Sequence, residues 1–128
     1  MPNSIINHYH EELEDWHNTI EFYSGEIEGF EASLSDLIHS NTIPHLAENA
    51  EYFLNQFSGL RSEFGGIGME LAAQEARLEE KEKMEQDVKY ASQVTQQQNT
   101  LRDRMKTVEQ HFIELKYSCQ QFLATHHR

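Results

Sequence analysis

The chain has 128 residues, a formal net charge of −12, and little glycine (6) or proline (2). This length suits one domain with its own core, so we treat residues 1–128 as a single domain, and the composition favours helices over a sheet. The negative charge argues against nucleic-acid and membrane roles, because both need clustered Lys and Arg.

The first predicted helix covers about residues 4–39, where apolar residues recur at alternating steps of three and four. Five heptads fit without a break. Heptad position a holds Ile6, Leu13, Ile20, Ile27 and Leu34, and position d holds Tyr9, Trp16, Tyr23, Phe30 and Leu37. Aromatic residues at d are too bulky for a tight parallel dimer, so they favour a core of three or more helices.

The second predicted helix covers about residues 44–81, after a turn at Ser40-Asn41-Thr42-Ile43-Pro44. Pro44 disfavours a helical conformation at Ile43 and suits the first turn of a new helix. The cluster Gly65-Gly66-Ile67-Gly68 interrupts good helix formers, but the heptad pattern passes through it without slipping. We therefore expect a continuous helix, kinked or closely packed there. The alternative is a four-helix bundle broken at Gly65-Gly66.

The third predicted helix covers about residues 88–124 and carries the same pattern from Ala91 to Phe122. The pattern dissolves between Leu78 and Ala91, where we place the second turn. Three helices of similar length are typical of an up-down-up bundle. The expected fold is thus an elongated all-α bundle of three long heptad-patterned helices.

Charge supports a pairing of the first and third helices. Residues 1–60 contain eleven Asp or Glu and no Lys or Arg, whereas residues 88–128 contain six basic and three acidic residues. Attraction between these helices would help to set their pairing, although an exposed pair contributes only tenths of a kcal/mol.

A stripe of metal-ligand residue types runs along the first helix. His10, Glu14, His17 and Glu21 follow steps of four, three and four, so they lie on one face about 60° wide. Imidazole and carboxylate groups together can bind a divalent ion, so His10, Glu14 and His17 are the candidate metal ligands. The alternative interpretation is a solvated or interfacial face without a metal.

The chain shows no sign of an enzyme or of a cofactor site. It contains no Gly-x-Ser-x-Gly, phosphate-binding loop, dinucleotide fingerprint or His-Glu-x-x-His motif, so we predict no catalytic residues and no cofactor. Cys119 occupies a heptad position between Leu115 and Phe122, where we expect a structural core thiol rather than a nucleophile.

The sequence also bears on location. A single cysteine excludes an internal disulfide, the N-terminal residues lack a secretory signal, and no apolar run approaches the length needed to span a bilayer. We therefore expect a cytoplasmic protein.

Several segments resemble a group of small uncharacterised bacterial coiled-coil proteins. The similar segments are Glu21-Phe22-Tyr23, Asn41-Thr42-Ile43-Pro44, Glu51 to Phe57, and Phe112-Ile113-Glu114-Leu115 with Phe122-Leu123. The resemblance implies a helical bundle, and it brings no activity, cofactor or partner with it.

The function expected from the sequence is a non-enzymatic interaction or scaffold role with a protein partner or a second copy, including a homodimer. Apolar residues outside the heptad stripes, such as Phe22 and Tyr117, support this expectation because some of them should be exposed or covered by another chain. Gly25-x-x-x-Gly29 marks at most a place where a neighbouring helix or subunit comes near. The alternative is a metal-binding bundle, a store, sensor or redox site, that uses His10, Glu14 and His17.

Overall fold

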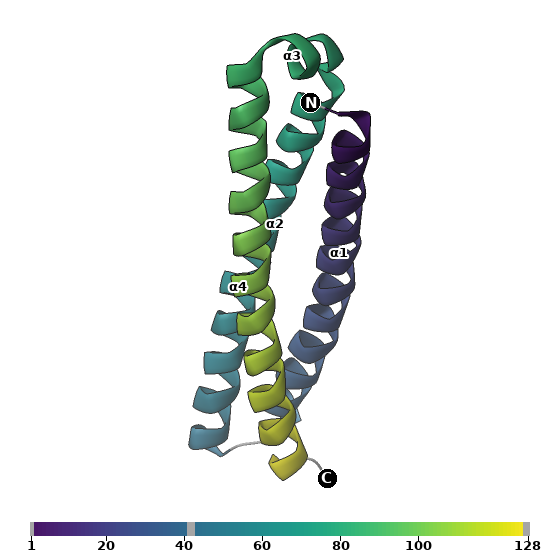
Figure 1. The fold of residues 1–128 in the computed structure, drawn as a ribbon. Coiled ribbons are helices and arrows are strands. Elements are labelled where there is room, and N and C mark those ends of the chain that lie inside the picture. The colour runs from purple at the N-terminus through teal and green to yellow at the C-terminus, as the bar shows by residue number, and fades with distance from the viewer. Residues whose placement is uncertain (1, 41–42, 127–128) are drawn as a thin grey trace.

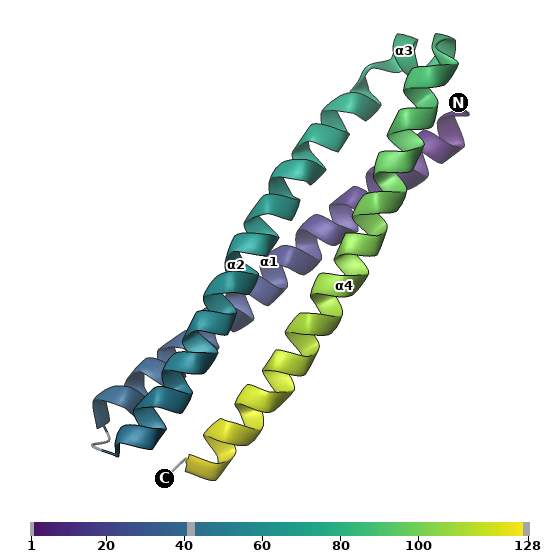
Figure 2. The same cartoon turned by 90° about the vertical axis from the view of Figure 1, so that its left-hand side faces the viewer.

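The computed structural model describes residues 2–40 and 43–126, of which 97% are helical, with no strand among them. Three long helices, α1 (Asn3–Ser40), α2 (Pro44–Glu79) and α4 (Val88–His126), pack side by side and alternate in direction. A short helix, α3 (Lys81–Gln86), connects α2 to α4 (Figure 1). The bundle is elongated, and α3 lies at the same end as the start of α1 (Figure 2). The predicted all-α bundle is confirmed.

The core consists of the predicted heptad residues, but the three long helices contribute to it unequally. Both the a and the d rows of α2 and α4 are buried over most of their length. In α1 only the a row is fully buried, and its d residues are partly exposed. Helix α2 packs against both other long helices, whereas α1 and α4 contact each other less.

The aromatic residues at position d of α1 fill the space towards the other two helices. The ring of Tyr23 stacks on that of Phe112 in α4, with centroids 4.4 Å apart, and the ring of Phe30 stacks on Phe57 of α2 at 5.3 Å. Such large side chains would not fit between two closely packed helices, and here they bridge three.

Helix α2 runs without a break through Gly65, Gly66 and Gly68, so the alternative of a break at Gly65-Gly66 is wrong. The expectation of close packing at these glycines is also wrong, because a Cβ atom built on any of them would meet nothing within 4 Å. Gly65 and Gly66 face solvent, and the buried neighbours Phe64 and Ile67 hold the segment against the core. Burial of these two side chains offsets the low helix propensity of glycine.

The second turn falls where it was predicted, but it contains the additional helix α3. The chain leaves the helical conformation only at Glu80 (φ −77°, ψ 70°) and at Asp87 (φ −107°, ψ 99°). Met84 of α3 is 1% exposed and anchors the turn to the core. The Tyr90 hydroxyl donates to the carbonyl of Arg77 at 3.1 Å, which ties the start of α4 to the end of α2.

The first turn ends at Ile43, which is extended (φ −80°, ψ 113°) as expected before Pro44. Asn41 and Thr42, which belong to the predicted turn, lie outside the described residues. Within the described part of the chain, no helix has a stretch both long and apolar enough to cross a membrane.

Candidate functional site

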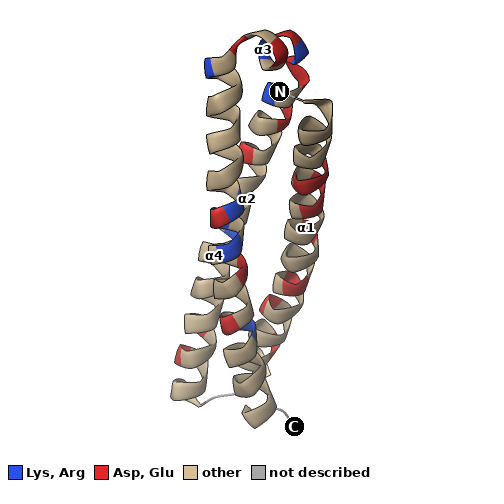
Figure 3. Cartoon of the chain, viewed as in Figure 1, with Lys and Arg blue, Asp and Glu red and all other residues tan. Residues whose placement is uncertain are grey.

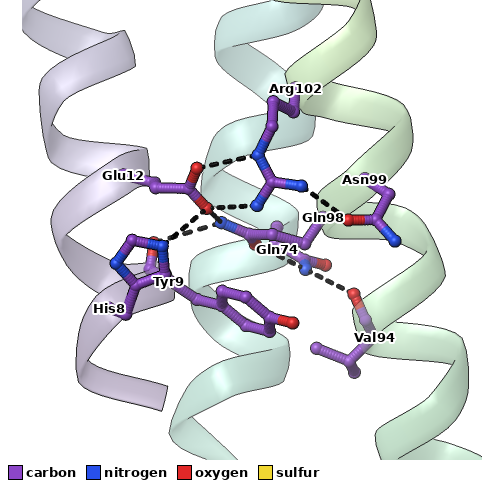
Figure 4. Close-up of polar contacts among 8 residues, drawn as sticks. All are labelled: His8, Tyr9, Glu12, Gln74, Val94, Gln98, Asn99 and Arg102. Atoms are coloured by element: carbon purple, nitrogen blue, oxygen red, sulfur yellow. Dashed lines mark hydrogen bonds and ion pairs between the residues drawn. The ribbon is translucent and has the colours of Figure 1, made fainter. Parts of the chain in front are cut away.

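Polar side chains from the three long helices form a layer across the bundle (Figure 4). Gln74 of α2 and Gln98 of α4 occupy core positions and are both 0% exposed. The Gln74 side-chain amide donates to Gln98 Oε1 at 3.0 Å and to the carbonyl of Val94 at 2.9 Å. The Gln98 amide in turn donates to the Tyr9 carbonyl of α1 at 3.2 Å. The layer thus joins all three long helices.

Glu12 of α1 extends this layer to the surface. Its Oε1 accepts hydrogen bonds from Gln98 Nε2 at 3.1 Å and from Arg102 Nη2 at 2.6 Å, and its Oε2 accepts from Arg102 Nε at 2.8 Å. The Arg102 guanidinium also donates to Asn99 Oδ1 at 2.6 Å. A bidentate Arg–carboxylate pair fixes the mutual position of the two helices more firmly than a single-point contact does.

The contacts between Glu12 and Arg102 shift the pKa values of both side chains. Burial by itself would raise the pKa of the Glu12 carboxyl, but hydrogen bonds from Arg102 and Gln98 and the charge of Arg102 lower that pKa below its ordinary value. The hydrogen bond to Glu12 raises the pKa of Arg102. The polar groups of the layer form hydrogen bonds with one another. We therefore interpret the layer as fixing the register of the three helices, and not as a catalytic or ligand-binding site.

Burial raises the pKa values of two further side chains, Tyr23 and Cys119. Burial, followed by a 2.8 Å hydrogen bond from the Tyr23 hydroxyl to Glu109 Oε2, raises the pKa of Tyr23 to about 12. Burial also raises the pKa of Cys119 to about 11, and this thiol is 0% exposed. The environment of Cys119 suits a structural thiol, because a cysteine nucleophile needs exposure and a lowered pKa.

The candidate metal residues lie on the opposite side of α1, facing α2. His10 Nδ1 is 2.5 Å from Glu75 Oε1, and His10 Nε2 is 3.9 Å from Glu79 Oε1. One ligand atom from each of these three side chains lies within 4.8 Å of the other two. An imidazole and two carboxylates from neighbouring helices therefore converge at one point.

The other two predicted ligands, Glu14 and His17, line the same groove between α1 and α2 as His10, but they do not join this cluster. His17 instead pairs with Glu21 on its own helix, with Nε2 and Oε1 3.3 Å apart. Both members of that pair are well exposed, at 59% and 69%. The predicted stripe on α1 thus contributes one residue, His10, to the cluster.

Glu75 and Glu79 were missed by reasoning from the first helix alone. Their signal in the sequence is a pair of carboxylates four residues apart at the end of α2, on one face of that helix. Because α1 and α2 run in opposite directions, this end of α2 lies beside the start of α1.

The outer face of α1 is the second candidate site. It carries a row of exposed acidic residues, and α1 contains no Lys or Arg (Figure 3). These residues are Glu11, Asp15, Glu21, Glu28 and Asp36. Phe22 lies among them and is 64% exposed. We call this surface, residues 11–36 on the solvent side of α1, the acidic face.

Comparisons with profiles of known protein families, with curated proteins and with solved structures return no match to this chain.

Proposed function

We propose that this chain is a non-enzymatic helical-bundle protein that binds another protein, and that the acidic face of α1 receives a basic, amphipathic helix of the partner. The observation that carries the proposal is the exposed Phe22 on a helix that carries acidic residues and no Lys or Arg. An apolar anchor within a charged rim is the usual anatomy of a protein interface.

Charge supports the choice of a basic partner. Asp15, Glu21 and Glu28 belong to the same acidic face as Phe22, and all three are exposed. A second copy of the same face would bring like charges together, which opposes association. A partner helix with Lys and Arg beside an apolar stripe complements both features of this surface.

The backbone of α1 is accessible beside Phe22, which supports contact with a helix. Gly25 and Gly29 are exposed, and a Cβ atom built on either would meet nothing within 4 Å. Ala32, also exposed, continues this row of small residues one turn further on. Side chains of a partner helix can therefore approach α1 closely next to the aromatic anchor.

The proposal can be tested with a synthetic helical peptide that has leucines on one face and lysines on the others, its affinity measured by calorimetry. We expect the peptide to bind, and a matched peptide with glutamate in place of lysine not to bind. The Phe22→Ala variant and the combined Asp15→Asn, Glu21→Gln, Glu28→Gln variant should each lower the affinity by roughly tenfold.

The matched control removes three exposed carboxylates from α2 instead, with Glu48→Gln, Glu51→Gln and Glu63→Gln. This control should keep the affinity, and an equal loss in both triple variants would reduce the binding to non-specific attraction by net charge. If the chain sediments as a homodimer that Phe22→Asp converts to a monomer, a second copy covers the face and the proposal of a basic partner is wrong.

A further inference from the structure

We propose that His10 of α1 with Glu75 and Glu79 of α2 forms a binding site for a divalent first-row transition metal ion, for which Zn²⁺ is the probe. Two of its residues, His10 and Glu75, line the groove between α1 and α2. It goes beyond the proposed function, and its site variants, at His10, Glu75 and Glu79, are separate from those that test the acidic face.

The distances suit one ion shared by three side chains. Zn²⁺ binds imidazole nitrogen and carboxylate oxygen at about 2.0–2.2 Å, so ligand atoms around one ion lie about 3–4 Å apart. The ligand atoms of His10, Glu75 and Glu79 already lie within 4.8 Å of one another. The two glutamates are 45% and 62% exposed, so a change of side-chain rotamer can close the remaining gap.

Charge distinguishes this cluster from the other pairs between helices. Elsewhere a carboxylate of α1 meets an arginine or lysine of a neighbouring helix, as in Glu12–Arg102, Glu26–Lys116 and Glu31–Arg61. Glu75 and Glu79 face a helix that has no Lys or Arg, and they meet an imidazole instead. A divalent cation bound by neutral His10 would neutralise both carboxylates, which the imidazole alone does not.

The groove leaves room to complete the coordination. It has a volume of about 390 Å³ and is lined by His10 and Glu75 together with Glu14, His17 and small residues of α2. Its open side admits water as a further ligand, and Zn²⁺ sites commonly combine three protein ligands with one water. A mixed nitrogen and oxygen ligand set favours a transition metal over Mg²⁺, which prefers oxygen ligands alone.

The test is calorimetric titration of the full, untagged chain with Zn²⁺, together with its thermal unfolding with and without the ion. We expect one ion per chain, a raised unfolding temperature, and no competition from an equal concentration of Mg²⁺. His10→Gln, Glu75→Gln and Glu79→Gln should each lower the Zn²⁺ affinity more than about tenfold.

The matched control is the double variant His111→Gln, Glu114→Gln. It removes an exposed imidazole and an exposed carboxylate of α4, outside the groove, and should keep the affinity of the original chain. Equal loss in the control and in the site variants would assign Zn²⁺ to scattered surface histidines and overturn the proposal. Absence of stoichiometric Zn²⁺ binding, or displacement by Mg²⁺, would also overturn it.

Helicity by circular dichroism verifies the fold of each variant. If His10→Gln unfolds the chain, Glu75→Gln and Glu79→Gln decide the question.

Discussion

Gln98 connects all three long helices through its side-chain amide, which bonds to Gln74 of α2 and to Tyr9 and Glu12 of α1. We expect Gln98→Ala to lower the free energy of unfolding by about 2–3 kcal/mol, because it leaves a cavity and removes hydrogen bonds from buried partners. Urea unfolding followed by circular dichroism measures this loss.

Replacing both glutamines should cost less than truncating one. In the double variant Gln74→Leu, Gln98→Leu, two buried amides that need each other disappear together, so we expect a smaller loss of stability or a gain. We expect the double variant to lose specificity in how its helices align, since buried polar groups restrict helix register. A double variant at least as unstable as Gln98→Ala would contradict this account of the layer.

Glu12 should make the stability of the bundle depend on acid pH. Its pKa is lowered in the folded state, so its contribution is complete above the unfolded pKa, near 4.5, and is lost as the pH falls through the lower folded pKa. Glu12→Gln should therefore be less stable than the original chain at neutral pH and should approach it in acid. Urea unfolding at several pH values tests this expectation, which fails if the two chains differ by the same amount at every pH.

At the scale of elements, α2 remains helical through a glycine cluster because burial on its inner face offsets poor propensity on its outer face. Gly65→Ala and Gly66→Ala should each raise the free energy of unfolding by about 0.5–1 kcal/mol, because both residues are helical and the added methyl group meets open space. Thermal or urea unfolding measures the gain. Ala73→Gly, at another exposed position of α2, is the reverse control and should lower stability by a similar amount. Loss of stability in both alanine variants would indicate that the glycines have a role not explained by helix propensity.

The arrangement of the whole bundle depends on which helices carry which charges. Lys116 Nζ of α4 lies 2.8 Å from Glu26 Oε2 of α1, and the spacing of 90 residues along the chain is the same as for Glu12 and Arg102. Glu26→Lys and Lys116→Glu alone should each lower the free energy of unfolding by about 0.5–1 kcal/mol, since each places like charges together. The double reversal should restore most of the loss, as a double-mutant cycle in urea would measure. Additive losses would mean that the pair does not couple α1 to α4.

The heptad pattern was sufficient to predict the three long helices and the faces that they turn to the core, because a residue's place on a helix face follows from local sequence spacing alone. The predicted ends at residues 81 and 124 differ from the observed ends at Glu79 and His126 by two residues. The short helix α3 was not predicted because only Met84 anchors it, and one apolar residue in a charged segment forms no periodic pattern.

The amino-acid sequence by itself determined that the chain forms long amphipathic helices, that Cys119 lies in the core, and that α1 is acidic without a balancing basic residue. Only the tertiary structure decided which polar side chains meet. His10 and Glu75 are 65 residues apart in the chain, and Glu12 and Arg102 are 90 apart. Such pairs depend on the register of one helix against another. That register is set by the packing of Phe57, Phe64 and Phe112 and by the buried glutamine layer, which no local pattern along a single helix encodes.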